Sequence, residues 1–213
     1  MAKDAHTYIY VQYGCGLCAP KSWMNFDASP SLRLQHLPLF GKFFRGWGLP
    51  PFPKHVRYGD IVRGLPVAIN SCDAIYCSHV LEHLALNDFR TALKNTYSYL
   101  KVGGVFRLVV PDIEFLAHRY LASPGPTASI VFIEGTGMGL KDRHRSLTAF
   151  LRAWLGHSKH SWMWDFPGMS AELVKVGFRD LRPALQGDSK LECFKVVEDP
   201  ARWKDCLGME CSK

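Results

Sequence analysis

Short apolar runs alternate along the chain with segments whose apolar residues recur at helical spacing. This alternation predicts an α/β fold, in which a mostly parallel sheet has helices on both faces. The runs at 74–78 and 105–110 are almost continuously apolar, which is typical of central strands buried on both faces. Shorter runs predict further strands at residues 7–13, 23–26, 56–58, 180–184 and 208–212.

Three helices are predicted at residues 87–100, after Asp112, and at 170–176, where apolar residues fall three or four positions apart. We expect Gly103 and Gly104 to end the first helix, because glycine commonly follows a helix C-terminus. Asp112 is expected to cap the second helix, since its side chain can accept from an unpaired backbone N–H.

Two regions depart from this regular alternation. Residues 35–54 are rich in proline, glycine and aromatic residues, which predicts a loop or short helices. Residues 133–164 are interpreted as an insertion with one helix near 147–155. We expect a single domain over residues 1–213, in which this insertion acts as a lid or as the acceptor site.

Composition is that of a globular protein of 213 residues, with 47% hydrophobic and 21% charged residues. No apolar run approaches the roughly 20 residues that cross a bilayer, and the first residues resemble no signal peptide, so we expect a cytoplasmic protein. The net charge of +7 permits a nucleic-acid partner, but no basic run exceeds two adjacent charges. The favoured interpretations are a solvated basic face, or attraction for an anionic acceptor such as a phosphorylated sugar.

The stretch from Tyr13 to Asp27 carries the first functional signal. A predicted strand leads into a turn whose glycines, Gly14 and Gly16, are two positions apart, and Asp27 ends the next apolar run. Glycines let the backbone approach a nucleotide-type ligand closely, and the later carboxylate accepts from ribose hydroxyls. Ligands of open α/β sheets bind beyond the carboxyl ends of the strands, where further polar residues follow the third and fourth strands: Asp60, Ser78 and His79.

Several motifs in a fixed order carry a family resemblance. They are Gly14-Cys15-Gly16, Trp23-x-Asn25-x-Asp27, Gly59-Asp60-Ile61, the stretch 78–84 and the stretch 103–112. Together they resemble the class I S-adenosylmethionine-dependent methyltransferases, over most of the chain from about Tyr8 onward. The resemblance implies a Rossmann-like, doubly wound sheet of seven strands in a three-layer sandwich, with an antiparallel C-terminal edge hairpin. It also implies S-adenosyl-L-methionine as cofactor and S-adenosyl-L-homocysteine as product.

The resemblance further implies which residues bind the cofactor. They are Gly14, Cys15 and Gly16 at its amino-acid end, Asp27 and Ala28 at the ribose, Asp60 and Ile61 at the adenine, and Ser78 and His79 at the closing wall. For Asp27 and Asp60 a loop or capping role is the alternative. Only ten residues separate Gly16 from Asp27, and Pro20 lies among them, so at most one helical turn fits there.

Methyl transfer is an in-line displacement that depends chiefly on positioning, although a hydroxyl or amine acceptor benefits from a base. Histidine has the most suitable pKa, and the candidates are His83, His79 and His160. The alternative for His83 is packing at a helix start, and for His160 it is an ordinary core position.

Two other interpretations remain at this point. His79-x-x-Glu82-His83 matches the inverted zinc-peptidase motif, but it would leave the glycine turn unexplained, so we expect no metal ligands. The chain could also be a cofactor-binding module that acts with a partner rather than catalysing. For an enzyme, we expect a small-molecule or sugar acceptor, with nucleic acid disfavoured.

Cys15 and Cys18 form a Cys-x-x-Cys pair among seven cysteines, but two further ligands at zinc-finger spacing are missing. We interpret them as reduced thiols packed near the cofactor, with a redox role as the alternative.

Overall fold

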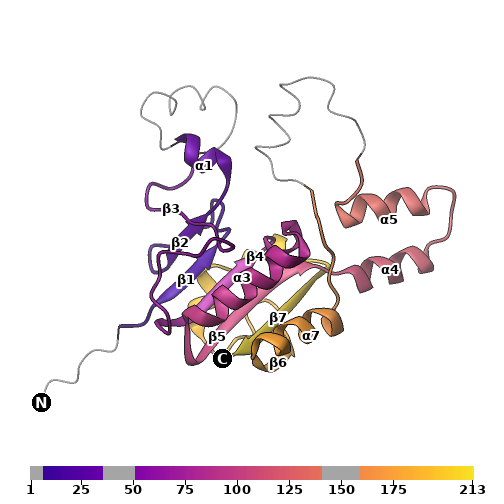
Figure 1. Cartoon of the computed structure of the whole chain (residues 1–213). Coiled ribbons are helices and arrows are strands. Elements are labelled where there is room, and N and C mark those ends of the chain that lie inside the picture. Colours follow the sequence, from indigo (N-terminus) through magenta and orange to yellow (C-terminus); the bar gives the residue numbers. More distant parts are fainter. Residues whose placement is uncertain (1–6, 36–50, 141–158) are drawn as a thin grey trace, which may run out of the picture.

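The computed structural model describes residues 7–35, 51–140 and 159–213. Within them seven strands form one sheet in the order β3-β2-β1-β4-β5-β7-β6 (Figure 1). All described pairings are parallel except those of β7, which runs antiparallel to both β5 and β6. The predicted α/β sheet and its antiparallel edge hairpin are confirmed. The strands are β1 Tyr10–Tyr13, β2 Met24–Asp27, β3 Arg57–Tyr58, β4 Cys72–Ser78, β5 Leu100–Pro111, β6 Arg179–Pro183 and β7 Cys206–Ser212.

Five α-helices are described, together with short 3-10 helices. Asp112 caps α4 by accepting from the N–H of Glu114, as predicted. The prediction for Gly103 and Gly104 is wrong: α3 already ends at Tyr99, and both glycines lie inside β5. Leu100 pairs with Cys72 of β4, so the chain passes from helix to strand without a loop. The α-helices are α1 Pro30–Gln35, α3 Leu86–Tyr99, α4 Ile113–Ala122, α5 Ala128–Thr136 and α7 Phe166–Val176.

One face of the sheet is covered by α3 and α7 (Figure 1). Alternate side chains of β1, β4 and β5 point into this layer, as the period of two in a strand requires. Phe89 of α3 stacks on Trp164, with ring centroids 4.2 Å apart, and this contact fixes the chain before α7. The main members of this core are Val11, Tyr13, Ile75, Cys77, Phe106, Leu108, Phe89, Leu93, Met169 and Leu173.

The opposite face is covered by the connection between β6 and β7, which we call the β6–β7 strap (residues 184–205). It contains the short 3-10 helices Glu192–Val196 and Pro200–Arg202. Phe194 and Val197 of the strap are buried against Ala74 and Tyr76 of β4. Full burial of each apolar side chain contributes roughly 1.5–3 kcal/mol, so the strap is an integral layer of the fold.

Arg107 of β5 ties the strap to the sheet. Its side chain is 0% exposed and donates to the carboxylate of Glu198 in the strap. Its Nη1 also lies 3.0 Å from Oε2 of Glu210 in β7 and 2.9 Å from Oδ1 of Asp188. The guanidinium is therefore surrounded by three carboxylates, two of which belong to the strap.

Parts of two predicted segments lie outside the described residues, namely 36–50 and 141–158, which include the predicted helix near 147–155. The start of the predicted insertion is described, and Ile133 belongs to α5. Among the described helices we find none with the length and apolar character of a membrane span.

Candidate functional site

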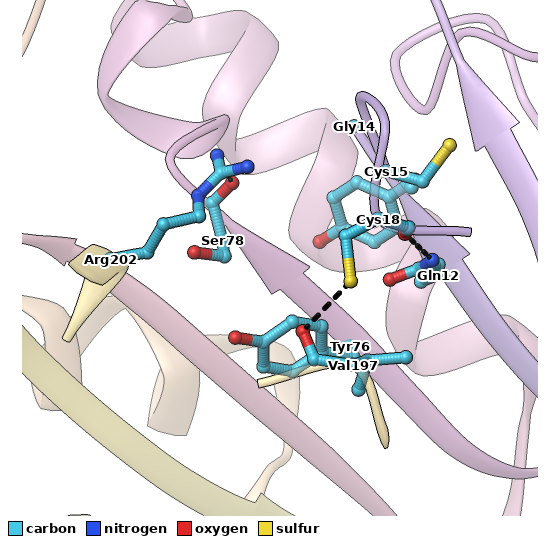
Figure 2. Close-up of a pocket in the computed structure, with 9 residues that line it drawn as sticks. Gln12, Gly14, Cys15, Cys18, Tyr76, Ser78, Val197 and Arg202 are labelled. Carbon is cyan, nitrogen blue, oxygen red and sulfur yellow. Dashed lines mark hydrogen bonds between the residues drawn. The ribbon is translucent and has the colours of Figure 1, made fainter. Parts of the chain in front are cut away.

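A small crevice opens where β1 and β4 end, at the point where the strand order reverses (Figure 2). One wall is β1 with the turn that follows it, the second is the end of β4, and the third is the strap. This is the position at which open α/β sheets bind ligands. The residues that line the crevice are Gln12, Tyr13, Gly14, Cys15, Cys18, Tyr76, Ser78, Val197 and Arg202.

The glycine turn needs its two glycines for different reasons. Gly14 and Gly16 both have left-handed backbones, with φ of +65° and +53°. A Cβ on Gly14 would also lie 2.0 Å from Cγ2 of Val80, just beyond β4, whereas a Cβ on Gly16 would meet only Nη1 of Arg202, 4.0 Å away. Gly14 therefore allows the ends of β1 and β4 to pack together, and Gly16 leaves the turn open toward the crevice.

Asp27 holds the turn from the end of β2. Its carboxylate is nearly buried, and Oδ2 accepts from the N–H of Gly16 at 2.9 Å while Oδ1 accepts from the N–H of Ser29 at 2.8 Å. The loop role considered as the alternative is thus present in the structure. Each oxygen keeps a further lone pair for a ligand hydroxyl, and Ala28 beside it is exposed.

The short connection between β1 and β2 has no helix, and two buried side-chain amides, which the sequence analysis missed, hold it in place. Gln12 donates through Nε2 to the carbonyl of Cys18 at 2.5 Å and to Oδ1 of Asn25 at 2.6 Å. Asn25 in turn donates to the carbonyls of Pro20 and Trp23. Polar residues at inward positions of apolar strands are the signal that could have identified them, because buried polar groups need partners.

Asp60 and Ile61 follow β3. Oδ1 of Asp60 accepts from the N–H of Val62 at 2.9 Å, and Oδ2 lies 3.5 Å from Nε of the exposed Arg63. The Ile61 side chain is buried in the main core, and its carbonyl accepts from Asn95. An adenine contact by Ile61, as the resemblance implies, would therefore use its main chain rather than its buried side chain.

Arg202, which the sequence analysis also missed, enters the crevice from the strap (Figure 2). Its Nη2 donates to the carbonyl of Ser78 at 2.6 Å, and its own carbonyl accepts from Nε2 of His79 at 2.9 Å. The space left is about 10 Å³, which is room for about one water molecule. A ligand of nucleotide size therefore requires the Arg202 side chain to move.

Three buried polar groups beside Arg202 have no hydrogen-bond partner of normal geometry: the hydroxyls of Tyr76 and Ser78 and the indole nitrogen of Trp203. Burial raises the pKa of the Tyr76 phenol, while the neighbouring Ser78 and Trp203 lower it by a smaller amount. An unpaired buried polar group costs roughly 1–3 kcal/mol, so this cluster favours a polar ligand or water.

The surroundings of His79 favour its protonated form. Burial lowers its pKa, but the Cys206 thiol, the Glu82 carboxylate 3.1 Å from Nδ1 and the Arg202 carbonyl together raise it to about 10. Among the three predicted base candidates, His79 is therefore disfavoured. Because both ring nitrogens are engaged, the inverted zinc-peptidase interpretation, which needs His79 as a ligand, is disfavoured as well.

His83 and His160 lie together, with ring centroids 5.0 Å apart in an edge-on arrangement. Nδ1 of His83 is 2.8 Å from the carbonyl of Lys159, and Nδ1 of His160 is 2.6 Å from the carbonyl of Thr136. A carbonyl can only accept, so each Nδ1 carries a proton, and Nε2 is the ring nitrogen that these two bonds leave unused. Two of the three predicted base candidates are thus brought together.

All seven cysteines are free. Burial, followed by the nearby Asp27, raises the pKa of the Cys15 thiol to about 12, and burial also raises the pKa of Cys18. Sγ of Cys18 donates to the carbonyl of Val197 at 3.7 Å (Figure 2). Protonated thiols are poor nucleophiles, which favours the packing interpretation over a redox role.

Comparison with known proteins gives one family match and several structural likenesses. Residues 45–108 match the model of a methyltransferase domain. A search of curated proteins gives no match. A S-adenosylmethionine-dependent methyltransferase of Thermotoga maritima, described as a possible histamine N-methyltransferase, is 18% identical with a TM-score of 0.50, covering 96% of this chain and 81% of that one.

Two further structures are similar at slightly lower scores. A methyltransferase of Archaeoglobus fulgidus is 16% identical with a TM-score of 0.49, over 97% of this chain and 86% of that one. A methyltransferase of Mesorhizobium loti is 15% identical with a TM-score of 0.48, over 96% and 90%. At such identities the likeness to the Thermotoga protein establishes the fold alone, and the domain match supports S-adenosylmethionine as the cofactor.

Proposed function

We propose that this chain, which has the class I S-adenosylmethionine-dependent methyltransferase fold and a methyltransferase-domain match, transfers a methyl group to a small-molecule or sugar acceptor. The observation that carries the proposal is the crevice at the ends of β1 and β4. The left-handed Gly14 lines it, and the left-handed Gly16 of the same turn donates to the carboxylate of Asp27. The hydroxyls of Tyr76 and Ser78, which lack partners, line it as well.

We assign the proposed cofactor contacts from the space and hydrogen-bonding capacity that remain at each residue. The open side of Gly16 suits the amino-acid end of the cofactor, and the remaining lone pairs of Asp27 suit ribose hydroxyls. Asp60 would lie at the adenine, and Ser78 would close the pocket with its unpaired hydroxyl. The cofactor supplies the activated methyl group, and these residues bind and orient it.

We propose His83 as the general base, because its Nδ1 is held by the Lys159 carbonyl and its Nε2 is not used in that bond. His160 packs against it. In its unprotonated form, Nε2 of one of these imidazoles would accept the proton of an oxygen acceptor while the methyl group is transferred. The acceptor's binding mode depends on residues beyond this pair, and the net charge of +7 favours an anionic one.

A second candidate function is a cofactor-binding module that acts with a partner. One observation favours it, because Arg202 fills the crevice that the cofactor would need. In this candidate the chain binds S-adenosylhomocysteine after Arg202 moves, but it shows no turnover on its own.

A thermal melt with and without S-adenosylhomocysteine tests the cofactor. A ligand at about 100 times its dissociation constant stabilises by roughly 2.7 kcal/mol, which for a chain of this size raises Tm by about 5–10 °C. Adenosine and methionine at the same concentration are the controls. An unchanged Tm at saturating S-adenosylhomocysteine would contradict the proposal. A shift without methyl transfer to any of a panel of sugar phosphates and small alcohols would favour the module.

A further inference from the structure

Glu82, His83 and His160 form a cluster of metal-ligating groups that the proposed function leaves partly unexplained. One ligand atom from each lies within 4.8 Å of the others. Two imidazoles bound through Nε2 to one tetrahedral ion have ring centroids roughly 5 Å apart, given bonds of about 2.0–2.1 Å. The observed separation for His83 and His160 is 5.0 Å, which matches that spacing.

Both histidines are oriented as metal ligands usually are. Metal-binding imidazoles almost always donate their second N–H to a carbonyl or carboxylate, which fixes the tautomer and the ring orientation. Here Nδ1–H of His83 donates to the Lys159 carbonyl and Nδ1–H of His160 to the Thr136 carbonyl. The Nε2 lone pairs are therefore the ones that remain free to bind a cation.

The buried carboxylate of Glu82 is an independent observation that points to a bound cation in this cluster. Its side chain is 0% exposed, yet within the described residues neither carboxylate oxygen has a hydrogen bond of normal geometry. Nδ1 of His79 lies 3.1 Å from Oε1, which is the ion pair found for Glu82 in the described part of the chain. A buried carboxylate with unused lone pairs is costly, and a bound cation would satisfy it.

The backbone holds the two halves of the cluster together. The Glu82 carbonyl accepts from the N–H groups of Ser161 and Trp162 at 2.7 and 3.0 Å, and Oγ of Ser161 donates to the His83 carbonyl. These bonds fasten residue 160, which is distant in sequence, beside the 3-10 helix Leu81–His83. The ligand positions are thus set by main-chain contacts on both sides.

We propose that Glu82, His83 and His160 bind one divalent transition-metal ion, of which Zn²⁺ is the best match to two imidazoles and a carboxylate. This departs from the expectation of no metal ligands, because His160, which is remote in sequence, takes the place that the motif gave to His79. Three protein ligands leave coordination positions open to water or an acceptor oxygen. His83 and His160 are partly exposed, which provides an entry path.

The ion would act next to the crevice, and this part of the inference rests on the proposed function. His79 bridges the two places, since Nδ1 faces Glu82 and Nε2 donates to the Arg202 carbonyl at the crevice. With the ion bound, Nε2 of His83 and Nε2 of His160 are occupied, so the ion takes the place of the histidine base. It would lower the pKa of a bound acceptor hydroxyl, whose proton passes to solvent, and hold that hydroxyl at the same edge of the sheet as the methyl donor. His79 is then a positioning residue for Glu82.

Metal titration of the EDTA-stripped protein tests the site, with Zn²⁺ followed by calorimetry and Co²⁺ by its visible absorption. The wild type is expected to bind one ion. His160→Ala is expected to bind it at least about 100-fold more weakly, because loss of a residue that merely supports a ligand already lowers metal affinity 10–100-fold, and this variant loses a ligand itself. His118→Ala is the matched control, since His118 is an exposed histidine on α4, and it is expected to bind as the wild type does. If His160→Ala fails to fold, His83→Gln replaces it.

Three results would overturn the metal site: no stoichiometric binding, equal binding by wild type and His160→Ala, or a thiolate-to-cobalt charge-transfer band that indicates cysteine ligands. The S-adenosylhomocysteine melt is repeated on His160→Ala, which is expected to keep the full rise in Tm. Absence of metal binding by the wild type, together with a normal rise in its Tm, would refute the metal site alone, so the two proposals fail separately.

Discussion

Arg107→Met is expected to lower the free energy of unfolding by about 3–5 kcal/mol, because it removes one partner from a buried ion network. The Glu198 side chain is 1% exposed and would be left buried without its guanidinium partner. Glu210 would lose the same cation, although Arg182 still binds it at 2.6 Å. The strap would then be held mainly by its apolar contacts.

Chemical denaturation of wild type and variant measures this loss, and Tm is expected to fall by roughly 6–20 °C. Arg63→Met is the matched control, because Arg63 is exposed and its 3.5 Å pair with Asp60 is a surface contact expected to contribute under about 1 kcal/mol. The double variant Arg107→Met, Glu198→Gln is expected to recover part of the loss, since the unpaired charge is gone. A loss below about 1 kcal/mol in Arg107→Met would show that the network does not anchor the strap.

Gly14→Ala is expected to destabilise the protein by about 2–5 kcal/mol, from two separate causes. A left-handed backbone costs a non-glycine residue roughly 1–2 kcal/mol, and Gly14 has φ of +65°. Its new methyl group would also lie 2.0 Å from Val80, and overpacking of this kind typically costs about 1–3 kcal/mol. Because this contact joins the ends of β1 and β4, the crevice would be displaced as well.

Gly103→Ala separates the two causes. Gly103 has φ of +77°, but a Cβ there would meet nothing within 4 Å. Its expected cost is the backbone term alone, about 1–2 kcal/mol. Urea denaturation of both variants measures the difference. Equal losses in the two would show that the contact with Val80 is not a constraint on the glycine turn.

The sheet could be predicted from sequence because its signals are local. Continuous apolar runs identify β4 and β5, and Asp112 and Gly177 mark helix ends through contacts within a few residues. The prediction for Gly103 and Gly104 failed because tertiary context decided it. Pairing of Leu100 with Cys72 extends β5 back to the end of α3, and the glycines are absorbed as an irregularity in the strand.

The strap could not be predicted for a related reason. Residues 184–205 have neither helical nor strand periodicity, so nothing local places them on the sheet. Their position depends on Arg107 meeting Glu198, which is 91 residues away, and on Phe194 packing against β4. A buried arginine in an apolar strand is a sign that acidic partners exist, but the sequence does not say which.

In the candidate site, too, the residues that could be predicted are those with local signals. Gly14, Gly16 and Asp27 were found because they follow successive strands, and parallel strands bring their carboxyl ends together. Arg202 comes from the strap, and the proton of His79 is held by groups from three segments, so neither could be predicted. The pairing of His83 with His160 likewise depends on hydrogen bonds between distant segments.

Calorimetric titration of S-adenosylhomocysteine into wild type and Arg202→Ala tests the central claim most directly. The cofactor is predicted to bind one to one, and about tenfold more tightly to Arg202→Ala, since a charge-assisted bond of roughly 1.5 kcal/mol to the Ser78 carbonyl no longer has to be broken. Lys204→Ala, an exposed strap position, is expected to bind as the wild type does. Absence of binding to both wild type and Arg202→Ala would contradict a cofactor site at the ends of β1 and β4.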